Sequence, residues 1–427
     1  MTELAVVVER TKSVCPVCLR SVDARIVRVG GEYFMRKQCA EHGKFSAVVW
    51  RTTTINSEQL TINNYVGSDD FTTDTIDNYM MAATCCALVE VTSRCNLCCP
   101  VCFAESGEIA RAEPSVDELY GIFKRLCDDG NTFIQLSGGE PTVRDDLPEI
   151  IAAARRAGAE TVQLNSNGLR LAREPDYAKT LHDAGLSFVF MQFDGTRGDI
   201  YERLRGRDLF ADKLAAIGNC GAAKLGVTLV PTVVPDVNLD NVGEIVNFAL
   251  SRSPDVRGVH FQPVSYFGRY PSPPRDRDRV TLPEILRAVE LQTNGRVRIT
   301  DFAPSSCDHP RCGFHGDFVV LPRGQLLKIT PKYDPDACCA PDAHIKNRKF
   351  VSRRWTRGDE EKTADNADFS TLDNFAKRAA SHGFTITAMA FQDAYTLDIA
   401  RLRRCSLHVA DASGRVKPFC AQYLTRV

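Results

Sequence analysis

Residues 95–102 read Cys95-Asn96-Leu97-Cys98-Cys99-Pro100-Val101-Cys102 and follow closely on an apolar, strand-like run at 87–91. Within this stretch, Cys95, Cys99 and Cys102 have the spacing C-x3-C-x2-C. Three thiolates on one short loop can bind three irons of a [4Fe–4S] cube and leave the fourth iron without a protein ligand. The stretch therefore predicts an iron–sulfur cluster with one coordination position open to a small molecule.

The chain around this loop alternates short apolar runs with helical patterns from Cys85 to about Ser265. The predicted strands are 87–91, 133–137, 161–165, 188–193, 227–233 and 259–262. The predicted helices are 115–128, which begins with a capping box, 147–157, 177–185, 209–223 and 242–250. Six such strand–helix units predict a parallel sheet that fits a partial barrel, with the active site at the C-terminal ends of the strands.

Small polar motifs follow the predicted strands at these ends. The paired glycines of the stretch 137–142, Ser-Gly-Gly-Glu-Pro-Thr, let backbone approach a ligand, and Glu140 or a neighbouring carbonyl accepts hydrogen bonds from an ammonium group. The stretches 165–168 and 192–195 end the third and fourth strands, where their polar side chains could hold a ribose. Taken alone, each motif is also explained by an ordinary turn or helix cap.

The cysteine loop, the Gly-Gly-Glu-Pro motif and the strand–helix units resemble the radical S-adenosylmethionine superfamily over about residues 85–265. The resemblance implies an α/β fold built on a partial (β/α)6 barrel. It makes Cys95, Cys99 and Cys102 the catalytic cysteines, whose cluster reduces S-adenosylmethionine and releases a 5′-deoxyadenosyl radical. Cys98 does not belong to the pattern and is expected to point into the core. The residues expected to bind the cofactor are Val101, Phe103, Gly138, Gly139, Glu140, Pro141, Asn165, Asn167, Gln192, Asp194 and Gln262.

A small metal-binding unit is expected ahead of the barrel, in residues 1–51. Two alternating runs joined at Gly30-Gly31 predict a tight hairpin, with a C-x2-C motif before it and a C-x2-H motif after it. Folding would bring the motifs together as a tetrahedral site for zinc or a rubredoxin-like iron. The alternative is a hairpin with incidental thiols. The candidate ligands are Cys15, Cys18, Cys39 and His42, and the polar stretch 52–83 predicts a connector to the barrel at 84–265.

Further thiols predict a C-terminal auxiliary iron–sulfur domain in residues 266–427. A hairpin turn at 411–415 would bring the last two candidate ligands together. Four thiolates would hold a second [4Fe–4S] cluster with no open position. The alternative is a β-structure without iron, and the adjacent Cys338-Cys339 has no assigned role. The candidate ligands are Cys307, Cys312, Cys405 and Cys420.

Two other C-terminal segments each have two interpretations. The Pro- and Arg-rich segment 266–279 is either a linker or a loop that covers the substrate. The basic segment 346–357 is either a positive lip that attracts an anionic substrate or a solvated loop whose charge is balanced by the acidic residues at 359–361.

The whole arrangement is similar to one branch of the superfamily, which contains the archaeal tetraether lipid synthase and pterin-modifying radical methyltransferases. The similarity implies a rubredoxin-like or zinc site before the barrel, auxiliary clusters, and carbon–carbon bond formation at unactivated carbons. The chain departs from that branch just before the first barrel strand. Where those enzymes have C-P-x-x-C-G-x-C, residues 78–86 read Asn-Tyr-Met-Met-Ala-Ala-Thr-Cys-Cys. One auxiliary cluster is therefore expected to be missing, or to be held differently by Cys85 or Cys86.

The composition excludes several other classes of protein. The 427 residues carry 53 basic and 54 acidic groups, so no nucleic-acid-binding surface is expected. No apolar stretch approaches the roughly 18 residues of a membrane span, and a cytoplasmic location is expected. The 17 cysteines are an odd number, which excludes complete disulfide pairing and favours metal binding.

The sequence thus predicts a radical enzyme that modifies an unactivated carbon of a small-molecule or lipid-like substrate, by C-methylation or another carbon–carbon bond formation. An electron donor such as ferredoxin or flavodoxin is the expected partner. One alternative is a peptide-modifying maturase or oxidase with an auxiliary cluster. The other is an iron–sulfur electron-transfer protein without catalysis, although such a carrier needs neither an open iron nor a Gly-Gly-Glu clamp.

Overall fold

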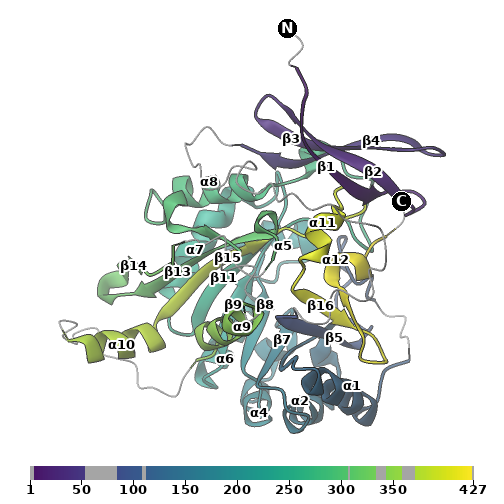
Figure 1. Cartoon of the computed structure of the whole chain (residues 1–427). Coiled ribbons are helices and arrows are strands. Elements are labelled where there is room, and N and C mark those ends of the chain that lie inside the picture. The colour runs from purple at the N-terminus through teal and green to yellow at the C-terminus, as the bar shows by residue number, and fades with distance from the viewer. Residues whose placement is uncertain are drawn as a thin grey trace.

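The N-terminal residues form a separate four-stranded antiparallel sheet. The computed structural model describes residues 4–52, 84–107, 112–305, 308–332, 343–357 and 371–425. The strands of this sheet, which we call the ribbon, are β1 (Val6–Val14), β2 (Ser21–Val29), β3 (Glu32–Cys39) and β4 (Gly43–Arg51), in the order β1-β2-β3-β4. The predicted hairpin at Gly30-Gly31 is confirmed by the pairing of β2 with β3. The ribbon stands at one side of the molecule, next to the C-terminal helices (Figure 1).

The barrel contains the six predicted strands, and each pairs in parallel with the next. A short strand, β10 (Thr232–Val233), lies beside the last of them. The strand interiors are almost wholly buried, as expected for a parallel sheet covered on its outer face by helices. The six strands are β5 (Cys86–Thr92), β6 (Phe133–Gly138), β7 (Thr161–Ser166), β8 (Phe188–Gln192), β9 (Gly226–Val230) and β11 (Val256–Pro263).

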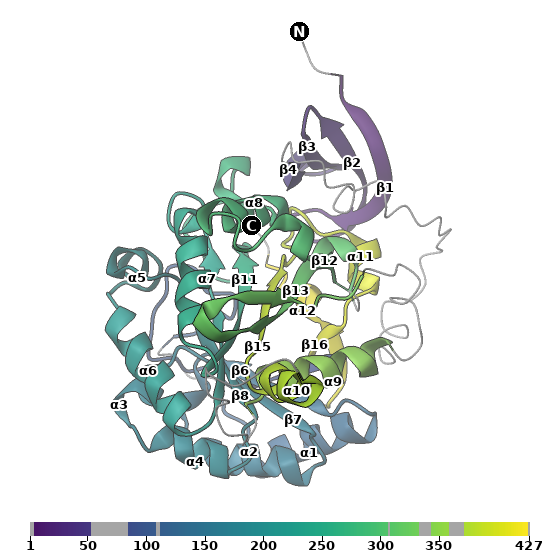
Figure 2. The same ribbon diagram turned by 90° about the vertical axis from the view of Figure 1, so that its left-hand side faces the viewer.

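Helices cover the outside of this sheet, as Figure 2 shows. The capping box predicted at Ser115 is present at the start of α1, and the buried face of that helix carries Leu119, Phe123 and Leu126. No helix in the described residues is long and apolar enough to cross a membrane. The helices are α1 (Val116–Asp128), α2 (Leu147–Arg156), α3 (Leu169–Arg173), α4 (Tyr177–Asp183), α5 (Gly198–Arg205), α6 (Phe210–Ala222), α7 (Val242–Ser251) and α8 (Leu282–Gln292).

Residues after 265 extend the barrel sheet at both edges, which the sequence did not predict. At one edge β15 pairs in parallel with β11 and in antiparallel with β13. At the other edge β16 pairs in parallel with β5 and forms the predicted hairpin with β17. The described C-terminal thiols, Cys312, Cys405 and Cys420, therefore lie next to strands that extend the barrel sheet. The strands are β12 (Ala303–Pro304), β13 (Gly313–Val320), β14 (Leu326–Lys328), β15 (Gly383–Met389), β16 (Leu407–Ala410) and β17 (Val416–Pro418).

Four C-terminal helices complete the described fold. The basic segment 346–357, interpreted from the sequence as a lip or a solvated loop, is largely helical. Its Trp355 is buried against Phe188 and Phe190 of the barrel, so this segment closes part of the barrel interior. The helices are α9 (Ala343–Trp355), α10 (Leu372–Ser381), α11 (Ile399–Arg403) and α12 (Phe419–Gln422).

The ribbon is attached to the barrel by buried polar contacts. Asp398, at the start of α11, accepts hydrogen bonds from the Thr11 hydroxyl (2.7 Å) and from Arg311 (3.2 Å). Arg311 also pairs with Glu9 of β1 at 2.9 Å. Lys37 donates to the carbonyl of Ala394 at 2.7 Å, and burial lowers the pKa of this lysine to about 7. Because these charged groups are removed from water, loss of a partner would leave a buried charge uncompensated and destabilise the fold.

Replacing Asp398 is expected to loosen the ribbon. Asp398→Ala removes one of the two acidic partners of the buried Arg311, the acceptor of the Thr11 hydroxyl and the cap of α11. The substitution should lower the free energy of unfolding by about 3 kcal/mol, measured by anaerobic urea denaturation. The matched control is Asp23→Ala, which removes an exposed pair with Lys12 and should cost less than about 1 kcal/mol. Equal effects of the two substitutions would contradict a structural role for this contact.

Candidate active site

A cavity of about 390 Å³ lies inside the barrel and reaches the C-terminal ends of its parallel strands. It brings together most of the residues predicted from the sequence. Pro141 and Asp194 are the two predicted barrel-site residues that are not part of its wall. The predicted residues that line the cavity are Cys95, Cys99, Val101, Cys102, Phe103, Gly138, Gly139, Glu140, Asn165, Asn167, Gln192 and Gln262.

The cysteine loop presents three thiols to this cavity. Burial, together with the negative charges of Glu140, Cys99 and Cys102, raises the pKa of Cys95 to about 12. Three crowded thiolates are stabilised by a bound metal cluster, so this donor set fits the [4Fe–4S] cluster that its spacing predicts. Cys98 was expected to point into the core, and this was wrong, because it is exposed. Cys98 lies on a surface loop and is not one of the three predicted ligands, so nothing requires its side chain to be buried.

The cysteine loop is held by the segment after the barrel. Arg269 donates to the carbonyl oxygens of Cys99 (2.9 Å) and Ser106 (3.0 Å), and its backbone exchanges two hydrogen bonds with Cys102. At Gly268, where φ is +52°, a Cβ would crowd the Cys102 carbonyl. This part of segment 266–279 is therefore a brace for the thiol loop, a role that neither sequence interpretation included.

The Gly138-Gly139 pair brings the end of β5 next to the end of β6. The backbone N–H of Gly139 donates to the Thr92 carbonyl, and that of Glu140 donates to the Arg94 carbonyl, both at 2.9 Å. A Cβ on Gly138 would overlap the Thr92 carbonyl oxygen, and one on Gly139 would overlap that of Arg94. The glycines are thus required for the close approach of the chain just before Cys95.

The carboxylate of Glu140 is buried and accepts four hydrogen bonds from the chain. The donors are the N–H (3.1 Å) and hydroxyl (2.7 Å) of Thr142, the Ser166 hydroxyl (2.8 Å) and the Asn167 N–H (2.6 Å). Burial raises the pKa of Glu140, and these hydrogen bonds oppose the effect. Asn167 in turn donates to Asn96 of the cysteine loop at 2.7 Å. Glu140 therefore fixes the geometry around the cavity, and its contact with an ammonium group stays a prediction.

Arg205 is a cavity residue that the sequence did not reveal. Its guanidinium forms two 2.7 Å hydrogen bonds with Asp194, which is fully buried behind it. The charge of Cys99 also acts on Arg205. The predicted site residue Asp194 thus orients Arg205 and does not itself reach the cavity. Nothing in the sequence around Arg205, on a helix with other basic residues, distinguishes it.

The second group of thiols lies beside the same cavity. The N–H of Ala390 donates to the Cys312 carbonyl at 2.8 Å, and that of Gln392 donates to the Cys420 sulfur at 3.2 Å. Burial raises the pKa of Cys405, and the negative charges of Asp308, Cys420 and Cys312 add to the effect. Arg401 donates to the sulfur of Cys312 at 3.4 Å. Cys307, Cys338 and Cys339 lie outside the described residues. Three of the four predicted auxiliary ligands thus lie in the same part of the described fold, and their binding of a cluster stays a prediction.

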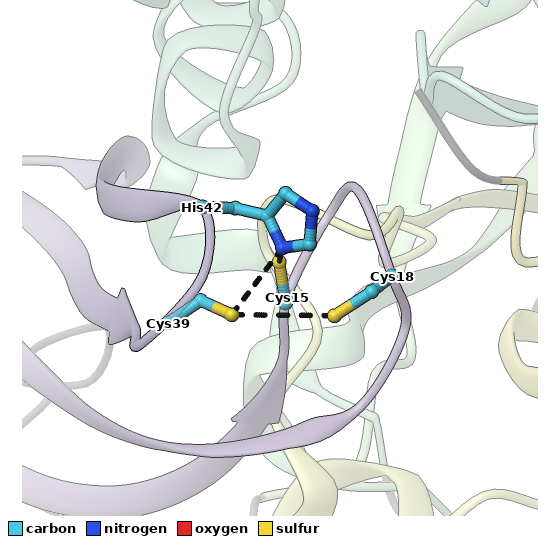
Figure 3. Close-up of side chains that lie close together, drawn as sticks. All are labelled: Cys15, Cys18, Cys39 and His42. Carbon is cyan, nitrogen blue, oxygen red and sulfur yellow. Dashed lines mark hydrogen bonds between the residues drawn. The ribbon is translucent and has the colours of Figure 1, made fainter.

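The ribbon also holds a compact metal-binding group, shown in Figure 3. The ligand atoms of Cys15, Cys18, Cys39 and His42 all lie within 4.8 Å of one another. His42 Nδ1 is 3.5 Å from the Cys39 sulfur and 3.7 Å from that of Cys15, and the sulfurs of Cys18 and Cys39 are 4.0 Å apart. A tetrahedral zinc site with three sulfurs and one nitrogen requires about 3.6 to 3.8 Å between ligand atoms. These distances favour a metal site over the alternative of a hairpin whose thiols have no metal-binding role.

Comparison with known families agrees with this geometry. A model of the Radical SAM superfamily matches residues 89–249, and one for the HMPTM N-terminal zinc ribbon domain matches residues 7–51. The 7,8-dihydro-6-hydroxymethylpterin dimethyltransferase of Methanocaldococcus jannaschii is 31% identical over 472 residues, which cover 96% of this chain and 92% of that protein. The chain belongs to the radical S-adenosylmethionine superfamily.

Other proteins match a smaller part of the chain. The Fe-coproporphyrin III synthase of Methanosarcina barkeri is 35% identical over 182 residues, covering 42% of this chain and 44% of that protein. The crystal structure of Streptococcus suis SuiB covers 50% of this chain and 46% of its own, with 14% identity and a TM-score of 0.42. As a radical S-adenosylmethionine enzyme, the protein uses S-adenosylmethionine and a [4Fe–4S] cluster, and its ribbon provides a further metal site.

Removing the Arg269 side chain is expected to impair cluster binding. Arg269→Ala leaves the carbonyls of Cys99 and Ser106 without their donor, so the reconstituted protein should bind less iron and show a weaker or altered EPR signal of the reduced cluster. Arg277→Ala, on the same segment but exposed, is the control and should load normally. Normal iron content and EPR in Arg269→Ala would contradict the brace.

Removing His42 tests the ribbon site. His42→Ala should lose one equivalent of zinc, measured by elemental analysis, while the iron content of the barrel is unchanged. The control is Glu41→Gln, which alters only an exposed pair with Arg20 and should retain the metal. An unchanged zinc content in His42→Ala would exclude this residue as a ligand, and iron in place of zinc would identify a rubredoxin-type site.

Proposed function

We propose that this enzyme methylates a carbon of a pterin-like heterocycle by radical chemistry. The observation that carries the proposal is the similarity to the M. jannaschii pterin dimethyltransferase over nearly the whole chain. That similarity spans the ribbon, the barrel and the C-terminal thiols, whereas the similarity to the coproporphyrin enzyme covers less than half of the chain. Similarity over all three parts of the chain favours a shared reaction and a related substrate, whereas similarity over the barrel alone would favour only a shared fold.

The cavity wall supports a polar ring as substrate over a lipid chain. Side-chain amides of Gln135, Gln163 and Gln262 reach the wall from three parallel strands. Phe190 and Trp355 add aromatic surface at the same cavity. The volume of about 390 Å³ is within the usual range of small-molecule sites. Gln135 accepts from the Cys86 thiol and Gln163 donates to Asn165, so each amide keeps further hydrogen-bonding capacity for a ligand. Polar groups that converge with aromatic rings suit a flat heterocycle, because a lipid chain would leave that capacity unused.

The roles of the individual residues follow from this proposal. Cys95, Cys99 and Cys102 hold the radical-forming cluster, which supplies the electron that cleaves S-adenosylmethionine. The C-terminal thiols hold an auxiliary cluster, and the ribbon binds zinc. Arg269 and Glu140 keep the thiol loop in place, and the barrel walls shield the reacting carbon from water. Residues 84–265 act as the barrel unit, and a ferredoxin or flavodoxin in the cytoplasm is the proposed electron donor.

The test is anaerobic turnover of the reconstituted enzyme with excess S-adenosylmethionine, a low-potential reductant and a 7,8-dihydropterin. One S-adenosylmethionine would be cleaved to 5′-deoxyadenosine and methionine, and a second would give its methyl group and leave as S-adenosylhomocysteine, with both electrons supplied by the reductant. We expect 5′-deoxyadenosine and a C-methylated pterin, both detected by mass spectrometry. Cys99→Ala should abolish 5′-deoxyadenosine, because one cluster ligand is lost. The neighbouring Cys98→Ala should retain activity, since Cys98 is exposed. Formation of 5′-deoxyadenosine without methylation of any dihydropterin would refute the substrate class.

A further inference from the structure

We propose that the inward face of β11, β15 and β13 is the subsite for the ring edge of the substrate, with His260 and His315 as its hydrogen-bonding groups and Asp317 as the residue that positions His315. The inference rests on the proposed function, in that the substrate is a flat nitrogen heterocycle. It adds the place and the groups that would recognise such a ring.

The strand register places the two imidazoles in one row. Thr387 of β15 lies opposite His260 of β11 on one side and opposite His315 of β13 on the other. Directly opposed residues of neighbouring strands present their side chains to the same face of a sheet. All three residues line the cavity. The row therefore offers adjacent hydrogen-bonding groups to one bound molecule.

Asp317 is arranged to orient His315. The two residues are two positions apart on β13 and share its inward face. Asp317 is 1% exposed, and its Oδ2 lies 3.0 Å from Nδ1 of His315. A carboxylate accepts the Nδ1 hydrogen, so in the neutral imidazole Nε2 is the acceptor left for another molecule. The other carboxylate oxygen of Asp317 is buried, and no donor among the described residues reaches it.

His260 contributes a neutral ring to the same row. Its Nδ1 is 2.7 Å from the Thr387 hydroxyl, and burial lowers the pKa of His260 to about 4. An uncharged imidazole can pair with a neutral heterocycle without bringing a charge into the cavity. Like His315, His260 lies directly opposite Thr387, so its imidazole is presented to the same face of the sheet.

Aromatic rings stand next to this row. The Phe190 ring centroid lies 5.3 Å from that of His260 and 4.8 Å from that of Trp355. Trp355 is fixed by a 2.8 Å hydrogen bond from its indole N–H to the Thr385 hydroxyl. A flat ring gains by packing against such surfaces while its edge meets polar groups. The combination selects a nitrogen heterocycle over an aliphatic chain.

The experiment measures binding of a 7,8-dihydropterin to the anaerobic holoenzyme by isothermal titration calorimetry. His315→Ala and His260→Ala should each raise the Kd about tenfold or more, because each removes a hydrogen bond from an enclosed site. Asp317→Asn should weaken binding in the wild-type background but add nothing to His315→Ala, as expected for a residue that acts through His315. The matched control is His182→Ala, on the exposed surface of α4, which should bind as wild type does.

Two further measurements keep the outcomes distinct. Iron content and the far-ultraviolet circular dichroism spectrum should match those of the wild type in every variant, which shows that the barrel is folded. His315→Gln replaces His315→Ala if the alanine variant fails this check. A wild type that binds no dihydropterin would overturn the proposed function and this subsite together. A wild type that binds, with histidine variants that bind equally well, would overturn the subsite alone.

Discussion

The buried carboxylate of Glu140 is the contact on which the geometry of the site depends. A carboxylate without partners is costly to bury, so its four donors must converge on it. Those donors belong to Thr142, Ser166 and Asn167, and the last of these also holds Asn96 of the cysteine loop. One acidic group thereby joins the ends of two strands to the loop that carries the thiols. The cysteine loop is thus held at Asn96 by this network and at the Cys99 carbonyl by Arg269.

Local patterns in the sequence predicted much of this architecture. Parallel strands that are buried on both faces have continuous apolar sequences. The six barrel strands were therefore predicted to within a few residues of their bounds. The metal group of the ribbon was predictable because ligand spacing on a hairpin determines which side chains meet, here Cys15, Cys18, Cys39 and His42. The hairpin of β16 and β17 followed from its turn residues in the same way.

Contacts between distant parts of the chain could not be predicted. The pairing of β15 with β11 joins residues more than 100 positions apart, and no local period encodes which edge such a strand selects. The same holds for Arg269, Arg205 and Asp317, whose roles depend on partners brought together only by the fold. The exposure of Cys98 could not be predicted either, because the direction of a side chain between two ligands depends on the conformation of the folded loop. The ribbon contacts of Thr11 and Glu9 are equally long-range.

We propose that the radical formed at the cysteine loop acts on a carbon of a heterocycle bound in the barrel cavity. Isotope transfer tests this step, with a dihydropterin deuterated at its carbon-bound positions and mass spectrometry of the 5′-deoxyadenosine released in anaerobic turnover. Deuterium should move from the pterin into 5′-deoxyadenosine. Turnover that yields only unlabelled 5′-deoxyadenosine would contradict it.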